Sequence, residues 1–414
     1  AALDHLNAQL YMWEDPASEQ FLKQLRNDPA ATFYPSGKLM LSAGNQEYVA
    51  ENFHLVYRFD IFAKEPFMNY YVDVDARNGT IVNKISRIAD DDVPGQGTSL
   101  YNGTVNMMVD SVNSTLYRLR EAGRGSGIQT FDALNQTNLN AAVDFEDTDN
   151  IFTAPNDHAG VSLHWGAEQT YDYHLTVHGR NSYDNAGGLI RGYAHFDDGW
   201  VNAQWVGSLQ IMRFGDGDGT SYDPLVSLDV IGHEFQHGVD QFSSNLIYQA
   251  ESGALDESFA DIFGTLIEFY VEGPNADWLI GAAFALNGVP FRSMSDPNSL
   301  GDPDTYFGNF WASLTGGDNG GVHTNSGVQN FWFYLLSEGG SGVNDNGDTY
   351  NVTGIGMDQA AHIANRNQSF YLGPSSKYFD ARLGAILSAI DLYGENSPQH
   401  QSTAEAWDAV GVYY

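Results

Sequence analysis

Asp229-Val-Ile-Gly-His233-Glu234-Phe-Gln-His237 is the stretch from which the fold and chemistry of this chain can be predicted. The run is typical of a helix, and two histidines four residues apart lie one turn above each other on one helical face. Both imidazoles can therefore reach a single metal ion, and Glu234, beside the first of them, is placed to act as a base. If that metal is zinc, the pattern indicates a hydrolase.

Composition excludes several classes of protein. The chain has 414 residues, enough for two or three domains, and no apolar run long enough to span a membrane. It carries 53 acidic against 18 basic residues, a net charge of -35 that argues against nucleic acid as a partner. The absence of cysteine rules out disulfides, thiolate nucleophiles and Cys-ligated zinc. The acidic excess fits a heavily solvated surface, adaptation to high salt, or many calcium ligands.

The order of patterns predicts an α+β chain in three parts. Residues 55–62 and 70–75 alternate like half-buried strands, which predicts a small α/β module over 1–92. Ala89 to Gly97 is expected to be an exposed acidic linker. A β-rich lobe over 93–248 follows, which includes the histidine helix, and then a mainly helical lobe over 249–414. Helices are expected near 159–179, 326–337, 357–368, 379–393 and 403–409.

A zinc ion in a hydrolytic site takes three protein ligands and keeps one position open, so the two histidines need a partner. Glu257 comes twenty residues after His237 in a segment that opens the next predicted helix, where its carboxylate can point back at the first. Asp261, one turn further on, can accept the outer ring N–H of a ligand histidine and fix its tautomer.

Two further residues are candidates for stabilising negative charge. Attack of water on a peptide carbonyl places that charge on oxygen, and hydrogen-bond donors aimed at it lower the barrier. His323 lies in the Gly-rich stretch Asp318-Asn-Gly-Gly-Val-His323, which we predict to be a loop, and Asp318 can tune it. Tyr248 is the second candidate donor.

His174 and His178 are also one turn apart, but no acidic residue lies between them and no carboxylate follows at a useful spacing. We therefore interpret them as a surface pair or a hydrogen-bonded core pair, in preference to a second pair of metal ligands.

With these motifs in this order, the sequence resembles the thermolysin family of zinc metalloendopeptidases, nearer to its vibriolysin and pseudolysin branch. The resemblance covers roughly residues 96–414. It is carried by the helix pair, by Arg292-Ser-Met-Ser-Asp-Pro297, by the His323 stretch and by Trp407-Asp-Ala-Val-Gly411. It implies two lobes joined by the central zinc-binding helix, with the active site in the cleft between them.

The resemblance also implies a role for each site residue. His233, His237 and Glu257 would bind one catalytic zinc, and Glu234 would be the general base. Tyr248 and His323 would hold the oxyanion, while Asp261 and Asp318 orient His233 and His323. The residues implied in substrate binding are Asn202, the Ala203 backbone and Arg292, with an apolar pocket of Leu225, Val230, Ile280 and Phe291 that favours Leu or Phe after the cut.

Calcium is implied as a second metal. Asp229, Glu268 and Asp277 match one site, but Leu279 and Ala282 stand where two-calcium members of the family carry carboxylates. A cluster with fewer charges holds one ion, so we expect a single calcium, completed by the Leu279 carbonyl. A second, separate site is matched by Asp147, Asp149 and Ile151.

Residues 1–92 resemble the later part of the family's pro-region, through Tyr57-Arg-Phe-Asp-Ile-Phe62 and the stretch from Tyr71 to Gly79. The implied role is that of an intramolecular inhibitor and folding helper, cleaved near 86–100. We therefore expect a secreted, monomeric endopeptidase acting on proteins and peptides, without a membrane partner. The alternatives are a catalytically silent binding or adhesion protein on a protease scaffold and, among enzymes, a zinc amidase acting on cell walls.

Overall fold

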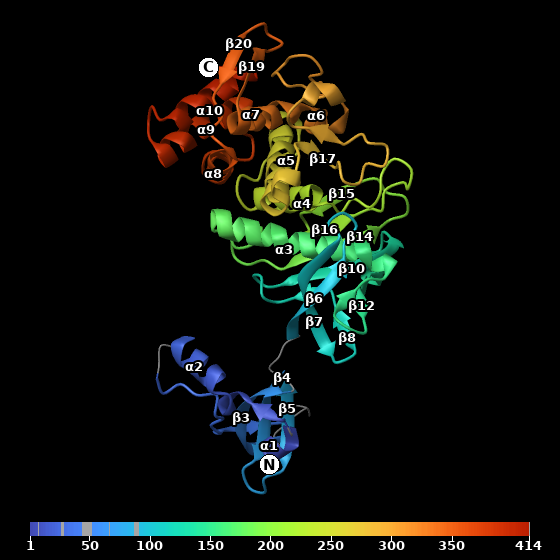
Figure 1. Ribbon diagram of the computed structural model, residues 1–414, viewed down its shortest axis with the longest axis vertical. Helices are drawn as coiled ribbons and strands as arrows, with labels where there is room; N and C mark the ends of the chain where they lie inside the picture. The colour runs from blue at the N-terminus through green and yellow to red at the C-terminus, as the bar shows by residue number, and fades with distance from the viewer. Residues whose placement is uncertain (7, 26–28, 44–51, 66, 87–90, 414) are drawn as a thin grey trace. The chain divides into compact units, whose positions relative to one another are not determined.

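The chain consists of two compact units, a front unit (Ala1–Asp91) and a main unit (Asp92–Tyr414). A computed structural model describes residues 1–414 except 7, 26–28, 44–51, 66, 87–90 and 414 (Figure 1). None of the helices in the described ranges combines the length and the apolar character that crossing a bilayer requires.

The front unit is an antiparallel sheet with two helices. The strand order is β1-β3-β4-β5, and β2 also pairs with β3. The elements are α1 (Ala2–Leu6), β1 (Leu10–Tyr11), α2 (Pro16–Leu25), β2 (Lys38–Ser42), β3 (His54–Glu65), β4 (Phe67–Asp75) and β5 (Ile81–Ser86). Both alternating segments of the sequence are strands as predicted, because Ile61, Val72 and Val74 face a small core.

The linker prediction for 89–97 was wrong where the structure describes it; residues 89 and 90 lie outside the described residues. Asp91–Thr98 is strand β6, which lies between β7 and β13 in a sheet of the main unit. The glycines that suggested a linker instead permit close packing. A Cβ on Gly97 would lie 2.7 Å from Val161, and one on Gly95 would lie 2.8 Å from Val109.

The first half of the main unit holds two sheets and helix α3 (His158–His178). One sheet has the order β12-β8-β7-β6-β13; the other has the order β11-β10-β14-β16-β15, with β9 paired to β10, so that β15 is an edge strand. Their strands are β7 (Thr104–Asn113), β8 (Leu116–Arg118), β9 (Arg120–Glu121), β10 (Ile128–Gln136), β11 (Val143–Asp144), β12 (Glu146–Asp147), β13 (Ile151–Phe152), β14 (Ile190–Phe196), β15 (Ala203–Val206) and β16 (Ile211–Phe214).

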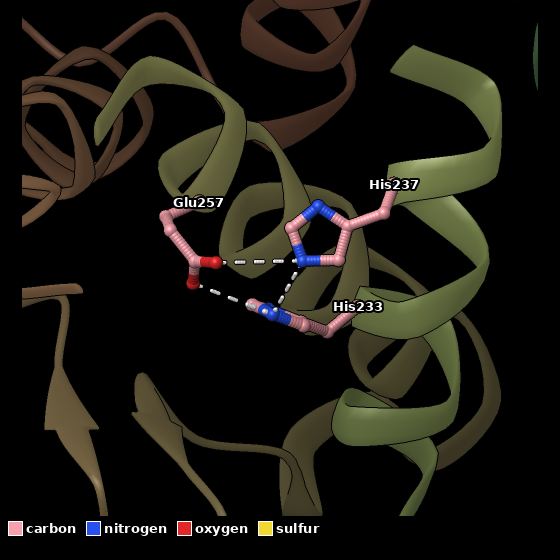
Figure 2. Close-up of side chains that lie close together, drawn as sticks. All are labelled: His233, His237 and Glu257. Carbon is pink, nitrogen blue, oxygen red and sulfur yellow. Dashed lines mark hydrogen bonds and ion pairs between the residues drawn. The ribbon is translucent and has the colours of Figure 1, made fainter. Parts of the chain in front are cut away.

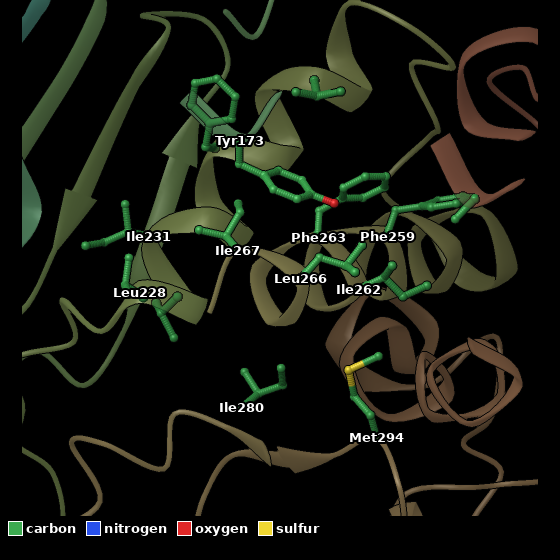
Figure 3. Close-up of a cluster of buried hydrophobic side chains, with 14 of the residues drawn as sticks. Tyr173, Leu228, Ile231, Phe259, Ile262, Phe263, Leu266, Ile267, Ile280 and Met294 are labelled. Atoms are coloured by element: carbon green, nitrogen blue, oxygen red, sulfur yellow. The ribbon is translucent and has the colours of Figure 1, made fainter. Parts of the chain in front are cut away.

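The second half is mainly helical. Its helices are α4 (Leu228–Gln241), α5 (Ala250–Glu272), α6 (Gly317–Asn325), α7 (Gly327–Glu338), α8 (Met357–Arg366), the π-helix η7 (Asn367–Tyr371), α9 (Tyr378–Tyr393) and α10 (Pro398–Ala409). Two short hairpins, β17 (Leu279–Ile280) with β18 (Arg292–Ser293) and β19 (Gly340–Val343) with β20 (Thr349–Val352), complete it. Figure 3 shows apolar side chains of α4 and α5 packed in one core with Tyr173 of α3.

One loop prediction and one helix prediction need correction. The predicted loop from Asp318 is assigned to α6, although residues 318–321 have left-handed backbone angles, so only the second half of α6 is ordinary helix. Helix α10 begins five residues earlier than predicted. Ser397 accepts a hydrogen bond from the backbone N–H of His400, and Pro398 follows it at the first helical position.

Candidate metal centre and catalytic cleft

Glycines allow the two helices that carry the predicted ligands to approach each other closely. Gly232 of α4 faces Gly264 of α5, and a Cβ on Gly232 would lie 3.0 Å from the Gly264 Cα. A Cβ on Gly264 would lie 2.2 Å from the carbonyl oxygen of Asp229, a contact that no side chain can make. This contact brings α4 close to α5, the helix that also carries Glu257.

His233, His237 and Glu257 converge on one point (Figure 2). The two histidine Nε2 atoms are 3.1 Å apart, and each lies 3.5 Å from one oxygen of Glu257. Ligand atoms about 2.0–2.1 Å from a tetrahedral zinc ion stand roughly 3.3 Å from one another. The three residues therefore fit a zinc ion, and among the described residues no other group of three or more possible ligand side chains lies as close together.

Each of the two predicted ligand histidines is oriented by a carboxylate on its outer nitrogen. His233 Nδ1 lies 2.9 Å from Asp261, and His237 Nδ1 lies 3.0 Å from Asp256. The contact with Asp261 is the one expected from the sequence. Asp256 was missed, although a second ligand histidine needs a second partner and an acid directly precedes Glu257.

The electrostatics favour a positive charge at this point. Burial disfavours the charged form of His237, yet Asp256, Glu257 and Glu234 raise its pKa to about 10. Burial likewise opposes ionisation of Glu257, but His323, both ligand histidines and Arg292 lower its pKa to about 2. An ionised carboxylate beside two imidazoles attracts either a proton or a cation to the inner nitrogens.

Glu234 lines the same cleft as His233, His237 and Glu257. Its Oε2 accepts a hydrogen bond of 2.5 Å from the backbone N–H of Trp205 on edge strand β15. Burial is the main cause of a raised pKa at Glu234. A base that is held in place and has a raised pKa is suited to take a proton from water.

Tyr248 and His323 meet at the mouth of the site. The Tyr248 hydroxyl lies 3.2 Å from His323 Nε2 and donates a hydrogen bond to Glu257. His323 is oriented by Asp318, which lies 2.5 Å from its Nδ1 and also accepts its backbone N–H. The left-handed turn at 318–321 makes this possible, because it folds the Asp318 carboxylate back onto the helix turn that carries His323.

The cleft has a volume of about 570 Å³. All seven residues assigned to substrate binding line it: Asn202, Ala203, Leu225, Val230, Ile280, Phe291 and Arg292. Leu225, Val230 and Ile280 are the buried apolar residues among these seven, apart from Ala203. The Arg292 guanidinium is held by Asp261, 2.6 and 2.7 Å away.

The expected calcium ligands come from the start of α4 (Asp229), the last part of α5 (Glu268) and the segment after α5 that holds Asp277 and Leu279. Burial together with Asp229, Asp277 and Glu272 raises the pKa of Glu268 to about 9, so these carboxylates are close neighbours. Glu268 Oε2 is buried without a hydrogen-bond partner. The Asp277 carboxylate accepts the Leu279 backbone N–H at 2.8 Å. A buried, unpartnered carboxylate oxygen beside other acids fits a cation.

The residues expected at a second calcium site are mutually hydrogen-bonded. Asp147 accepts the backbone N–H of Asp149 at 3.1 Å, and Asp149 accepts that of Ile151 at 2.9 Å. They form a turn at the surface, without a buried unpartnered oxygen.

The interpretation of His174 and His178 as a surface pair or a hydrogen-bonded core pair was wrong for His174. Its ring is fully buried between Phe235 and Phe263, and neither of its nitrogens has a hydrogen-bond partner. His178 Nε2 lies 3.2 Å from the Tyr173 hydroxyl. The sequence pattern gave no sign that this face of α3 packs against α4 and α5.

The fold and the site therefore define the class of a two-lobed metallopeptidase with a HExxH helix. The family description "Thermolysin metallopeptidase, catalytic domain" matches residues 94–241, and "Thermolysin metallopeptidase, alpha-helical domain" matches residues 244–412. The chain belongs to the thermolysin family of metallopeptidases.

Relatives and a solved structure agree with this assignment. The thermostable neutral protease NprT of Geobacillus stearothermophilus and a thermolysin of Bacillus sp. (strain EA1) are each 41% identical over an alignment of 364 residues that covers 83% of this chain. The chain spans 64% of the length of these relatives. The precursor of protealysin, a metalloproteinase from Serratia proteamaculans, matches with a TM-score of 0.57 and 29% identity, over 69% of this chain and 87% of that one.

Proposed function

We propose that the chain is a zinc-dependent endopeptidase that cuts before bulky apolar residues. The observation that carries the proposal is the convergence of His233, His237 and Glu257 at tetrahedral spacing, beside Glu234 in an open cleft. Membership of the thermolysin family supports the same conclusion. A catalytically silent binding protein would have no need for the full set of buried, mutually oriented ionisable groups.

His233, His237 and Glu257 would hold the zinc ion, which would act as a Lewis acid toward the scissile carbonyl and the attacking water. Glu234 takes the proton of the attacking water and passes it to the leaving amine. Its bond from the Trp205 N–H holds one carboxylate oxygen, which leaves the other free for this transfer.

Tyr248 and His323 donate hydrogen bonds to the oxygen on which negative charge develops. Both already lie beside Glu257, at hydrogen-bond distance from each other. Asp318 accepts from His323 Nδ1, so the Nε2 hydrogen of a protonated ring points toward the cleft. Donors fixed before the reaction stabilise the transition state without reorganising during it.

Substrate preference follows from the cleft wall. Leu225, Val230, Ile280 and Phe291 present apolar surface, which favours Leu or Phe directly after the cut. Asn202 and the Ala203 backbone, at the edge strand β15, would hold the substrate main chain, and Arg292 would bind a substrate carbonyl.

One calcium ion would bind at Asp229, Glu268 and Asp277, with the Leu279 carbonyl as a further ligand. The unpartnered Glu268 oxygen supports this assignment. We also propose the second site at Asp147, Asp149 and Ile151, which rests on the sequence match.

The front unit would act as a pro-segment that inhibits the main unit, and the enzyme would be secreted, on the vibriolysin and pseudolysin branch of the family. The likeness to a solved precursor structure supports a pro-form. Because β6 starts at Asp91, the last residue of the front unit, and pairs in a sheet of the main unit, a cut inside it would disrupt a strand that lies between β7 and β13. We therefore expect processing at or before Asp91.

The test is to incubate the full chain with casein and with blocked peptides that differ only at the residue after the cut. Mass and N-terminal analysis of the chain run in parallel. We expect processing at or before Asp91, cleavage before Leu and Phe, loss of cleavage with a zinc chelator, and recovery with stoichiometric zinc. Processing without any peptide cleavage by zinc-loaded protein would contradict the proposal, and activity on peptidoglycan alone would favour a cell-wall amidase.

A further inference from the structure

Asp261 serves two parts of the proposed site at once. One of its oxygens accepts two hydrogen bonds, from His233 Nδ1 at 2.9 Å and from a terminal nitrogen of Arg292 at 2.6 Å. The other oxygen accepts Arg292 Nε at 2.7 Å. The carboxylate is fully buried, and Arg292 and His233 hold its pKa below its usual range although burial opposes ionisation. Its orientation therefore decides where both a metal ligand and a substrate-binding arginine point.

Asn330 of α7 occupies the remaining hydrogen-bonding position of that carboxylate. Its Nδ2 donates to the second Asp261 oxygen at 2.7 Å. Its own Oδ1 accepts from the Ser258 hydroxyl at 2.7 Å, which fixes which end of the amide faces Asp261. Asn330 and Ser258 are both fully buried, so water cannot replace either of them at this position.

We propose that Asn330 is a positioning residue for zinc binding, acting through Asp261 on His233. This inference rests on the proposed function. A carboxylate offers about four acceptor positions, and here two are filled by Arg292, one by His233 and one by Asn330. Without Asn330, one buried oxygen has Arg292 as its only donor, and the carboxylate turns toward the arginine and away from the histidine.

The same helix offers a matched control. Gln329 is the neighbour of Asn330, is equally buried, and neither end of its side-chain amide has a hydrogen-bond partner. Asn330→Leu and Gln329→Leu therefore both place an apolar side chain in the core at α7. Only the first of them removes a bond to Asp261.

The experiment measures zinc affinity of the full chain by competition with a chromophoric chelator, after removal of bound metal. We expect the zinc dissociation constant to rise about 10- to 100-fold in Asn330→Leu, the range seen when a partner behind a metal ligand is lost, and less than twofold in Gln329→Leu. In cobalt-substituted protein, the visible absorption bands report ligand geometry, and they should change only in Asn330→Leu.

Ser258→Ala provides a milder variant in case Asn330→Leu does not fold cooperatively. This variant removes the hydrogen bond that fixes the Asn330 amide, but Asn330 can still donate to Asp261. The zinc dissociation constant should therefore rise roughly threefold to tenfold, as for one lost hydrogen bond. In the double variant Ser258→Ala/Asn330→Leu the two effects should not add, because the serine acts through the asparagine.

Wild-type zinc affinity and cobalt spectrum in a folded Asn330→Leu chain would overturn the inference, as would an equal loss in Gln329→Leu. If Asn330→Leu does not fold, unchanged affinity in Ser258→Ala would overturn it. A wild-type chain that binds no zinc would overturn the proposed function and this inference together.

Discussion

The Tyr248 hydroxyl is bound to Glu257 and adjacent to His323 Nε2, so a single phenol connects a metal ligand with the second proposed donor. Tyr248→Phe removes the donor and keeps the ring. We expect kcat to fall about 10²- to 10³-fold with KM changed little, since the lost bond strengthens only in the transition state. Steady-state kinetics on a blocked peptide measure this, with bound zinc assayed as the control. An unchanged kcat at full zinc occupancy would contradict the role.

The residues of the proposed metal site could be predicted from spacing because helical geometry dictates which side chains share a face. His233 and His237 share one face of α4, and Glu257 and Asp261, four residues apart, share one face of α5 for the same reason. Asp256 could not be assigned in this way. Its contact with His237 depends on how α4 crosses α5, and the one sequence signal for it was that His237 needs a carboxylate partner of its own.

The close approach of α4 and α5 depends on Gly264, where an added Cβ would lie 2.2 Å from a backbone carbonyl oxygen. Gly264→Ala should push the helices apart, lower the free energy of unfolding by about 1–3 kcal/mol or more, and weaken zinc binding. Gly373→Ala is the control, since a Cβ there meets nothing within 4 Å. Chemical denaturation and chelator competition measure both effects. Wild-type stability and zinc affinity in Gly264→Ala would show that the close contact at Gly264 does not determine the spacing of the proposed zinc ligands on α4 and α5.

Helix α3 buries His164, which lies 3.0 Å from the Thr130 hydroxyl and 2.9 Å from the Met108 carbonyl oxygen. Burial lowers its pKa from 6.5 to about 4. At a pH between these two pKa values, the unfolded chain carries a proton on this histidine that the folded chain does not. The contribution of the neutral, buried His164 to the free energy of unfolding is therefore complete above pH 6.5 and is lost as the pH falls. His164→Gln should therefore reduce the pH slope of the unfolding free energy between pH 6.5 and 4 by about 1.4 kcal/mol per pH unit.

The measurement is chemical denaturation at several pH values, followed by tryptophan fluorescence, for wild type and His164→Gln. His5, an exposed residue of the front unit, provides the control as His5→Gln. Equal slopes for wild type and His164→Gln would contradict a buried neutral histidine.

Elements whose apolar residues recur with a clear period could be predicted from the sequence, and the glycine-containing elements β6 and α6 could not. The strands β3 and β4 and the helices α5 and α9 follow from alternating or helical spacing of apolar residues. Strand β6 and helix α6 contain Gly95, Gly97, Gly320 and Gly321, which are typical of loops. Their conformations depend on close tertiary contacts, which local patterns do not contain.

The whole molecule carries a net charge of -35, and its excess carboxylates repel one another more strongly in the folded state than in the unfolded chain. Salt shortens the screening length from about 10 Å at 0.1 M to about 3 Å at 1 M. With calcium kept saturating, the melting temperature of the full chain should rise by several degrees from low to molar NaCl, and equally in KCl. A flat response would contradict charge repulsion as a limit on stability.

The central claim is that Glu234 transfers the proton for a zinc-dependent attack of water, and Glu234→Gln tests it with the least change of shape. The amide keeps the contact with the Trp205 N–H but cannot accept a proton from water. We predict that the zinc-loaded variant retains one zinc per chain and loses at least about 10³-fold in kcat/KM. Peptidase activity within tenfold of wild type, at the same zinc content, would contradict the account.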